Sequence, residues 1–301
     1  MTKPIEQKAI DVIGIGQCAL DYIGLIGKYP DADTKCEFTG LLVQGGGPVA
    51  TALVALQRWG MKCSFCGVAG DDEFGNLIIR DLEHEGVDLT GLKIRKESVS
   101  QFAFSLAEPL TGRRTIFWRR PSGTPLQPDE VDPEMILGVR CLLTDAFFPD
   151  ATLAACKTAR KTGIPVVVDA GSLRPGMPEI MKLSNYFIAS ENFARAFMPG
   201  KSIGKVCRAI AGQGPELAAV TLGEKGYAAY FNSKFIEVPA FPVEAVDTTG
   251  CGDIFHAGFV YGMLNAWKPA RSLKFAAWAA AMVSRFPGGR TGIPDAGEWA
   301  G

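Results

Sequence analysis

The sequence predicts an α/β protein in which helices cover a mostly parallel sheet, with a small antiparallel sheet beside it. Segments with the pattern of buried strands alternate with segments of helical spacing along most of the chain, which is typical of parallel sheets covered by helices. Two strand-like segments, 98–109 and 112–120, interrupt the alternation because only a short turn separates them. They predict a β-hairpin that stands apart from the main sheet.

In the N-terminal third, the segment 10–27 begins as a strand and continues with small residues. The segment 48–60 has helical spacing of its apolar residues; Pro48 suits a first helical turn and Gly60 suits a C-cap. The other elements expected there are a strand ending at residue 44, a strand at 63–70 and a helix at 74–86. The stretch 36–44 is a candidate third strand for the small sheet.

After residue 121 the alternation resumes, as the spacing of apolar residues shows. The expected strands are 141–147, 164–171, 185–190, 216–223 and 226–232. The expected helices are 151–163, 178–184, 191–197, 253–267 and 270–286.

The composition is that of an ordinary globular protein. Of 301 residues 47% are hydrophobic, and 31 basic against 32 acidic residues give a net charge of −1. This charge gives no electrostatic reason to expect a nucleic acid or an anionic membrane as a partner. The longest apolar run, 275–283, is far shorter than the ~20 residues of a membrane span. The N-terminus lacks the apolar stretch of a secretory signal, so we expect a cytoplasmic protein.

The eight cysteines do not indicate a disulfide scaffold in a chain of this size. Cys63 and Cys66 form the one CxxC pair, but they lie in an expected strand, where positions three apart point to opposite faces. Only two histidines, His84 and His256, accompany them. We therefore expect these cysteines to be structural rather than a zinc or redox site.

The strongest chemical signal is the segment 246–262, where a loop runs through Gly250, Cys251 and Gly252 into a helix with Asp253 in its first turn. Glycines allow a ligand to approach the backbone, and the unpaired amides of a helix N-terminus attract an anion. A carboxylate beside them can accept the proton of an attacking hydroxyl, which suits phosphoryl transfer to an alcohol. Taken alone, the pattern also fits an aspartate that caps a helix after a glycine turn.

Further motifs favour a phosphoryl-transfer site over a simple helix cap. The stretch DTTGCGD, 247–253, resembles the DTxGAGD signature of the PfkB (ribokinase-like) carbohydrate kinases, with Cys251 at the usual alanine. Four more segments resemble family motifs in family order: 45–60 the glycine run and its helix, 67–78 the G-x-x-GxDxxG segment, 221–226 the nucleotide-site turn, and 287–295 the loop that closes the nucleotide site. The form of several motifs is most similar to the ketohexokinase and sulfofructose kinase branch.

This resemblance implies a single ribokinase-like domain over residues 1–301: a doubly wound α/β core with a small β-sheet lid formed by about 18–44 and 98–121. It also implies transfer of the ATP γ-phosphate to a primary hydroxyl of a sugar, a ketose or related polyol. Asp253 would be the general base and the amides of Gly250, Cys251 and Gly252 the anion hole. Since Cys251 contributes only its N–H, we expect no catalytic thiol.

The resemblance also assigns sugar contacts. Asp21 matches the family's aspartate that binds sugar hydroxyls, and Gly46 and Gly47 would pack against the sugar. Thr51 stands where the family often has an asparagine, so one sugar hydrogen bond is expected to differ. The expected binders of an anionic substituent, such as a phosphate or sulfonate, are Lys35 and Arg119.

The lid strand 112–120 carries four arginines around Phe117 and Trp118. By alternation Arg113 and Arg119 share one face, and Arg114 and Arg120 share the other. One set could face the sugar. The alternative is a solvated basic edge that discourages strand addition.

On the nucleotide side, the resemblance implies ATP and Mg²⁺. The expected nucleotide-binding residues are Ser190, Thr221, Gly223, Gly226, Thr248 and His256, with His256 as lining or packing rather than an acid–base partner.

The family's NxxE motif falls at 190–193 with neither its Asn nor its Glu in place. Glu191 is the candidate to hold magnesium through water, or else a first-turn helix acid. A monovalent cation would use Asp247 and Thr249, although Gly292 replaces a residue that often supplies a hydroxyl ligand.

Three alternatives stay open at this point. A nucleoside kinase could use the same scaffold, and a non-catalytic sugar-binding regulator would explain the altered metal-organising motif. A dinucleotide-binding oxidoreductase is disfavoured because the initial glycines lack G-x-G-x-x-G spacing. The sequence does not name the acceptor sugar. Exposed lid strands such as 115–120 make a homodimer through two lids a further expectation.

Overall fold

The computed structural model describes residues 10–111 and 113–301, and its largest element is a nine-stranded sheet. The strand order is β13-β12-β11-β10-β9-β8-β1-β4-β5. The parallel strands are β1 (Val12–Ile15), β4 (Cys63–Gly70), β5 (Asp88–Arg95), β8 (Cys141–Thr144), β9 (Val166–Ala170), β10 (Tyr186–Ser190) and β11 (Leu217–Thr221). Two antiparallel strands, β12 (Tyr227–Phe231) and β13 (Lys234–Val238), extend the sheet beyond β11.

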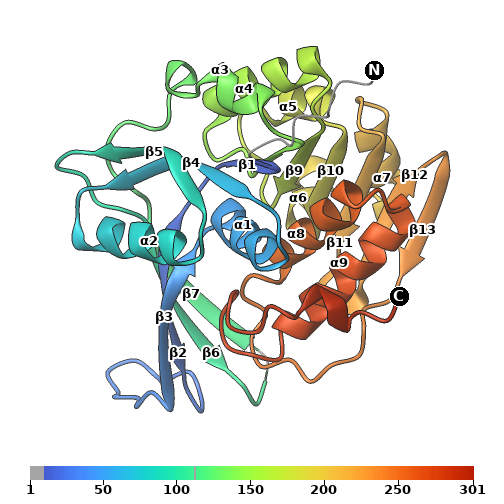
Figure 1. The fold of residues 1–301 in the computed structure, drawn as a ribbon. Coiled ribbons are helices and arrows are strands. Elements are labelled where there is room, and N and C mark those ends of the chain that lie inside the picture. The colour runs from blue at the N-terminus through green and yellow to red at the C-terminus, as the bar shows by residue number, and fades with distance from the viewer. Residues whose placement is uncertain (1–9, 112) are drawn as a thin grey trace.

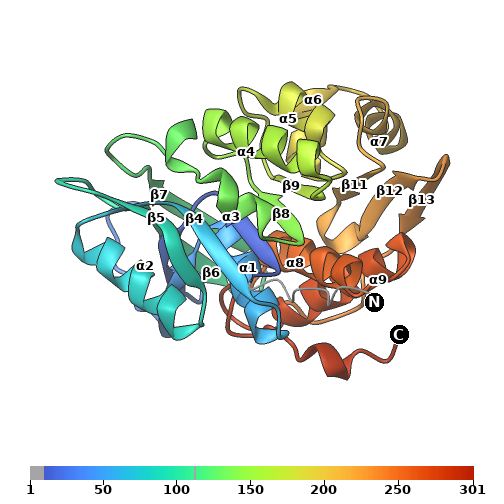
Figure 2. The same cartoon turned by 45° about the horizontal axis from the view of Figure 1, so that its top comes forward.

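Helices cover both faces of this sheet (Figures 1 and 2). One face carries α1 (Pro48–Arg58), α2 (Glu73–His84), α8 (Cys251–Leu264) and α9 (Pro269–Val283). The other carries α3 (Pro133–Leu137), α4 (Pro149–Thr162), α5 (Met177–Leu183), α6 (Glu191–Phe197) and α7 (Ile203–Ala211). Short 3₁₀ helices lie at Pro128–Glu130, Gly223–Lys225 and Ala296–Glu298.

The two faces bury separate cores because successive strand residues point to opposite sides. In β1, Val12 belongs to the core under α1 and α8, whereas the next residue, Ile13, belongs to the core under α4. Cys63 and Cys66 of β4 divide in the same way. The prediction that these two thiols face opposite sides of the sheet is confirmed.

A separate four-stranded sheet, which we call the lid, projects from one end of the core (Figure 1). Its order is β3-β2-β6-β7, with β2 and β6 parallel and the other pairs antiparallel. The strands are β2 (Ala19–Leu25), β3 (Gly40–Gly46), β6 (Phe102–Glu108) and β7 (Arg113–Arg119). The expected hairpin is β6 and β7, so the predicted small antiparallel sheet is confirmed.

The structure adds elements that the apolar pattern did not indicate and corrects one boundary. The strands β5 and β13 are half exposed and α7 is short, so none has a long apolar run. The segment expected to begin with one strand holds two, β1 and β2, because the chain leaves the main sheet at Gly16 and enters the lid at Ala19. In the described part of the chain, no helix combines the length and apolar character needed to cross a membrane.

Candidate active site

The candidate active site lies at the edge of the main sheet where the parallel strands end. The chain proceeds from β1 to β4 and β5 on one side and from β8 to β11 on the other, so β1 and β8 form a topological switch point. Open α/β sheets bind ligands just beyond the strand ends at such a point. There Asp145, which follows β8, accepts a hydrogen bond over 2.9 Å from the amide of Gln17, which follows β1.

The loop at 247–250 leads into α8 beside this edge. Gly250 is the N-cap of α8 with φ of 74°, and a side chain there would strike the backbone of Gly289. The amide of Cys251 donates to the carbonyl oxygen of Thr248 over 3.4 Å, and the amide of Ile254 donates to the carbonyl oxygen of Gly250 over 2.9 Å. Beyond Gly252 there is open space. The first turn of α8 therefore leaves amides and room for an anion such as a phosphate.

Asp253 lies partly buried in the same turn. Burial raises the pKa of its carboxyl well above the ordinary value; the negative charges of Asp169, Asp21 and Asp145 raise it further, and Arg290 opposes them. A carboxylate with a raised pKa is a better proton acceptor near neutral pH than an exposed one. The structure thus brings the expected base and the expected anion hole together on one helix turn.

Asp21 lies on β2, on the side of the lid that faces the core. Burial raises its pKa to about 6, against the attraction of Arg290 and with a contribution from Asp247. Its carboxylate occupies the space where a side chain of Gly46 would lie. Gly47 has φ of 93° and faces the carbonyl oxygen of Gln17. The glycine run therefore serves close packing within the protein, a reason that sequence reasoning did not give.

Arg290 is a buried charged residue beside the candidate site that sequence reasoning missed. It comes from the C-terminal loop, is 3% exposed, and pairs with Asp81 of α2. Its Nε donates to Oγ1 of Thr51 over 3.3 Å and its Nη2 to the carbonyl oxygen of Gly46 over 3.5 Å. Burial lowers the pKa of this guanidinium, and Asp81 and Asp21 oppose the effect. Thr51 thus contacts Arg290.

Asp247 and Thr249 form a tight turn before α8. Oδ1 of Asp247 accepts from the amide of Thr249 over 2.9 Å and from its hydroxyl over 2.8 Å. Oδ2 accepts from the amide of Gly288 over 2.9 Å. Both carboxylate oxygens already hold the loop and the C-terminal segment in place.

Four of the six expected nucleotide-binding residues lie at the ends of β10 and β11, whereas Thr248 lies in the loop before α8 and His256 within α8. Ser190 and Thr221 are direct neighbours in the strand register, and Ser190 caps α6 by accepting from the amide of Phe193 over 3.0 Å. Gly223 and Gly226 bracket the short 3₁₀ helix with φ of 60° and 93°. Such positive angles suit glycine and set the turn.

Glu191, the candidate magnesium residue, is the first residue of α6. Its side chain is 30% exposed and lies 2.5 Å from Arg195. Within the described ranges, no three acidic, histidine or cysteine side chains cluster as a metal site. Magnesium commonly binds through substrate phosphates, water and one or two carboxylates. A single partly exposed carboxylate fits that mode.

His256 and Asp169 lie beneath the site. His256 is 3% exposed, and its Nδ1 lies 3.3 Å from Oδ2 of Asp169, at the end of β9. Neither Asp169 nor Asp145 stood out in the sequence, because each follows an ordinary apolar strand. Their position at the strand ends is the signal that could have identified them.

The lid brings one arginine to the site. Arg114 of β7 donates a hydrogen bond to Oγ1 of Thr248, in the loop before α8. The register places Arg114 on the same face as Asp21, and Arg119 on the other face, opposite Phe102. Lys35 lies in the exposed loop between β2 and β3. The lid cation at this site is thus Arg114, and not Arg119 or Lys35.

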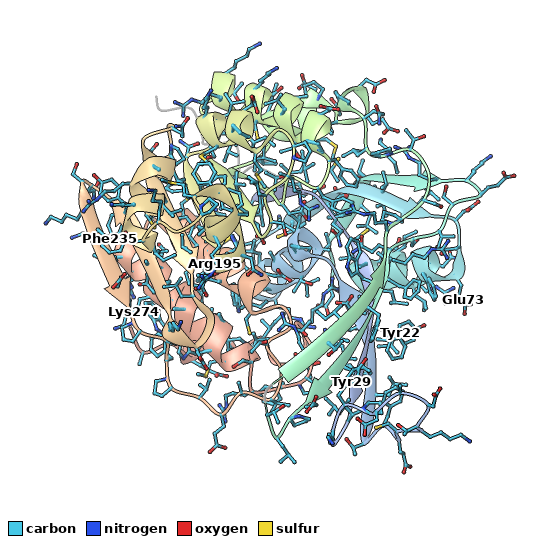
Figure 3. The ribbon with its side chains drawn as sticks, turned by 180° about the vertical axis from the view of Figure 1, so that it is seen from behind. Tyr22, Tyr29, Glu73, Arg195, Phe235 and Lys274 are labelled. Carbon is cyan, nitrogen blue, oxygen red and sulfur yellow. The ribbon has the colours of Figure 1, made fainter. Side chains whose placement is uncertain are left out.

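The outer face of the lid is aromatic. Tyr22 stacks on Phe104 with ring centroids 5.5 Å apart and meets Phe74 of α2 edge-on. Seen from behind, Tyr22 lies on the side of the lid toward Glu73, while Tyr29 lies nearer its far end (Figure 3). This face points away from the residues described above.

Comparisons with known proteins agree with this geometry. A family model described as "pfkB family carbohydrate kinase" matches residues 9–296. The ribokinase of Bacillus subtilis is 28% identical over 293 residues, covering 94% of this chain and 96% of that protein. Two solved structures share the fold at 23% identity and cover 96% of this chain and 97% of theirs. They are a ribokinase from Thermotoga maritima, TM-score 0.83, and an Arabidopsis thaliana ribokinase complexed with ribose and ATP, TM-score 0.80.

Proposed function

The chain belongs to the pfkB family of carbohydrate kinases, and from this premise we propose that it transfers the γ-phosphate of ATP to a primary hydroxyl of a sugar. The acceptor is a ketose or a related polyol, and Asp253 is the general base. One observation carries the proposal: Asp253 lies in the first turn of α8, and the space beside Gly252 in the same turn is open.

The proposed reaction follows from these groups. Asp21 binds sugar hydroxyls and orients the acceptor, and Asp253 accepts the proton of the attacking hydroxyl. The amides of Gly250, Cys251 and Gly252 stabilise the negative charge on the transferring phosphate. The lid, with Arg114 above the loop, excludes water, so ATP is not hydrolysed.

Magnesium would be held by the ATP phosphates and, through water, by Glu191. When bound, it neutralises charge on the phosphates during transfer. The nucleotide would lie along the ends of β10 and β11, next to Ser190 and Thr221, with Gly223 and Gly226 shaping the turn. Because the reaction consumes ATP, we place the protein in the cytoplasm.

The proposed monovalent cation and the proposed anionic substituent of the sugar receive different support from the geometry. A monovalent cation at Asp247 and Thr249 would share a carboxylate that already accepts three hydrogen bonds. Activity measured with potassium, sodium or neither ion tests it. An anionic substituent bound by Arg119 or Lys35 has weaker support, since Arg119 lies on the outer face of the lid and Lys35 lies in the exposed loop between β2 and β3.

A homodimer through two lids is supported by exposed apolar side chains on the outer face. Leu41, Val43 and Phe117 are 57%, 44% and 53% exposed. Apolar patches of this kind commonly mark protein interfaces. Light scattering after gel filtration should give twice the chain mass for the native protein and the single mass for Phe117→Lys.

An acceptor screen that follows ADP release tests the activity. Ketoses, aldoses, phosphorylated sugars, sulfosugars, adenosine and inosine are each offered with ATP and magnesium. Phosphorylation of a sugar supports the proposal, whereas phosphorylation of a nucleoside alone would make the protein a nucleoside kinase.

The variant Asp253→Asn separates a kinase from a non-catalytic sugar-binding protein. We expect turnover to fall by at least about 10²-fold, the lower end of general-base contributions. Asp150→Asn, on an exposed residue of α4, is the matched control. Equal ADP release in both variants would contradict a kinase that uses this base.

A further inference from the structure

The ring of His256 faces oxygen atoms at both of its nitrogens, and two of these oxygens belong to backbone carbonyls, which only accept. The residue lies in α8 and is 3% exposed. Its Nδ1 lies 2.6 Å from the carbonyl oxygen of Gly252, one turn earlier in the helix. Its Nε2 lies 3.1 Å from the carbonyl oxygen of Ile188 in β10.

These two contacts determine the number of protons on the ring. A carbonyl oxygen only accepts, and a neutral imidazole carries only one N–H. If the ring were neutral, one nitrogen lone pair would face a buried carbonyl oxygen without a proton between them. An unsatisfied buried polar group of this kind is costly. Both contacts are hydrogen bonds only when both nitrogens are protonated.

Asp169 supplies the opposite charge that a buried imidazolium requires. Its Oδ2 lies 3.3 Å from Nδ1 of His256, and Asp169 itself is 7% exposed. Burial raises the pKa of Asp169, and the attraction of His256 and of Arg174, in the loop after β9, opposes that rise. The charged groups around the ring are thus Asp169 and Arg174 from the β9 side, Asp145 after β8, and Asp253 on α8.

We infer that His256 is held as an imidazolium paired with Asp169, and that it is a positioning residue for the phosphate site at the start of α8. The second half of this inference rests on the proposed function; the first half stands on the geometry of the ring alone.

The connection to the phosphate site is the peptide bond between Gly252 and Asp253. The carbonyl oxygen of Gly252 accepts the charged hydrogen bond from His256, while the amide on the other side of the same peptide belongs to Asp253. A hydrogen bond to the carbonyl polarises the peptide and makes its N–H a stronger donor. The imidazolium also adds positive charge one turn from the helix N-terminus, where an anion binds. The same bond fixes the position of the backbone that carries the Asp253 carboxylate.

Protonation of the ring can be read directly, because the chain contains only two histidines. His84 is exposed at the end of α2 and serves as the internal reference. Protein labelled with ¹⁵N-histidine is measured at about pH 7 by proton–nitrogen correlation spectra, which report the proton on each ring nitrogen. The variant His84→Gln assigns the signals.

We expect the spectrum at neutral pH to show a proton on both ring nitrogens of His256. In Asp169→Asn, the N–H signal of one of these nitrogens should be lost from the same spectrum, because the counter-charge of the imidazolium is gone. A neutral His256 ring with one tautomer at neutral pH would overturn the inference. So would a spectrum unchanged by Asp169→Asn.

Kinetics test the positioning role. We expect His256→Gln to lower kcat by about tenfold, the size of one charge-assisted hydrogen bond, while the KM for the sugar changes by less than about twofold. A kcat equal to that of the native enzyme would overturn this role. If circular dichroism shows that His256→Gln is unfolded, Asp169→Asn takes its place, with the same expected split between kcat and KM.

The two proposals can fail separately. The nitrogen spectra need neither ATP nor sugar, so they report on the imidazolium even if no acceptor is phosphorylated. Conversely, an active kinase whose His256 is neutral would retain the proposed function and remove only this inference.

Discussion

Arg114, on the last strand of the lid, donates a hydrogen bond to the hydroxyl of Thr248, in the loop that leads into the first turn of α8. The two residues are 134 positions apart in the chain. This contact joins the lid directly to the loop in which the proposed anion hole begins. It places a permanently charged guanidinium within reach of a phosphate at that turn.

We predict that Arg114→Gln lowers kcat by about 10- to 100-fold, since a hydrogen bond from a charged donor contributes about 1.5–3 kcal/mol. Steady-state kinetics with ATP and the accepted sugar measure the change. Arg119→Gln is the matched control because Arg119 lies on the outer face of the same strand. Equal losses of kcat in the two variants would show that the positive charge of the lid as a whole, and not the contact of Arg114 with Thr248, supports turnover.

We predict that Asp21 contributes both to sugar binding and to the pH dependence of stability. Its pKa of about 6 lies above the ordinary 3.8, so the folded state binds this proton more tightly than the unfolded state. The cost to stability is fully present above about pH 6 and disappears as the pH falls toward about 4. Removing it with Asp21→Asn should therefore raise the free energy of unfolding at about pH 8 by at most about 3 kcal/mol, and with it the Tm, and should raise neither at about pH 3.5.

The same variant should raise the KM for the sugar by at least about tenfold, because a charged acceptor for the hydroxyls is lost. Asp31→Asn, in the exposed lid loop, is the control for both measurements. An unchanged Tm at the higher pH would refute the buried charge, and an unchanged KM would refute the sugar contact.

Gly46→Ala should weaken sugar binding without touching the sugar. The new methyl group would occupy the space of the Asp21 carboxylate, which must move. We expect the KM for the sugar to rise by about tenfold and kcat to fall less, since misplaced binding groups chiefly affect orientation. Gly27→Ala, in the lid loop with open space around it, should leave both constants unchanged.

Cys251 should be dispensable as a thiol. Burial raises its pKa to about 12, opposed by the attraction of Arg114, so almost no thiolate exists at neutral pH. We predict that Cys251→Ala retains activity within about twofold, because the amide at this position is unchanged. In the native protein a thiol reagent should modify Cys36, which is exposed, well before Cys251. Rapid loss of activity that follows modification of Cys251 alone would contradict this.

The fold class and the centre of the site could be predicted because their signals are local. Alternating strand and helix patterns indicate the main sheet, and Gly250, Gly252 and Asp253 lie within four positions of one another. The resemblance to carbohydrate kinases is confirmed by the family match, while the particular branch stays a prediction.

The local sequence pattern does not predict which face of the lid meets the site. Alternation correctly separated Arg114 from Arg119, but both faces of β7 carry arginine and an aromatic residue. Which face meets the site depends on how the lid sits on the core, and no residue within the strand encodes that. The structure settles it through the contact between Arg114 and Thr248.

The sequence also did not predict contacts between segments that are distant along the chain. Arg290 meets Asp81 across 209 positions and Thr51 across 239. The loop that contains Arg290 was assigned by resemblance to the nucleotide side, and its arginine carries no signature of its own. Only the structure shows that this guanidinium donates to the carbonyl oxygen of Gly46 in the glycine run.

The position of Arg290 near the end of the chain also sets when the site can form during translation. The ribosome adds residues 288–290 after every strand of both sheets has been made, and these residues supply the amide for Asp247 and the guanidinium near Asp21. A nascent chain that stops at α9 holds Asp253 and its helix turn without the charge that balances the neighbouring carboxylates. The carboxylates at this edge of the sheet therefore gain their balancing positive charge only once residue 290 has been added.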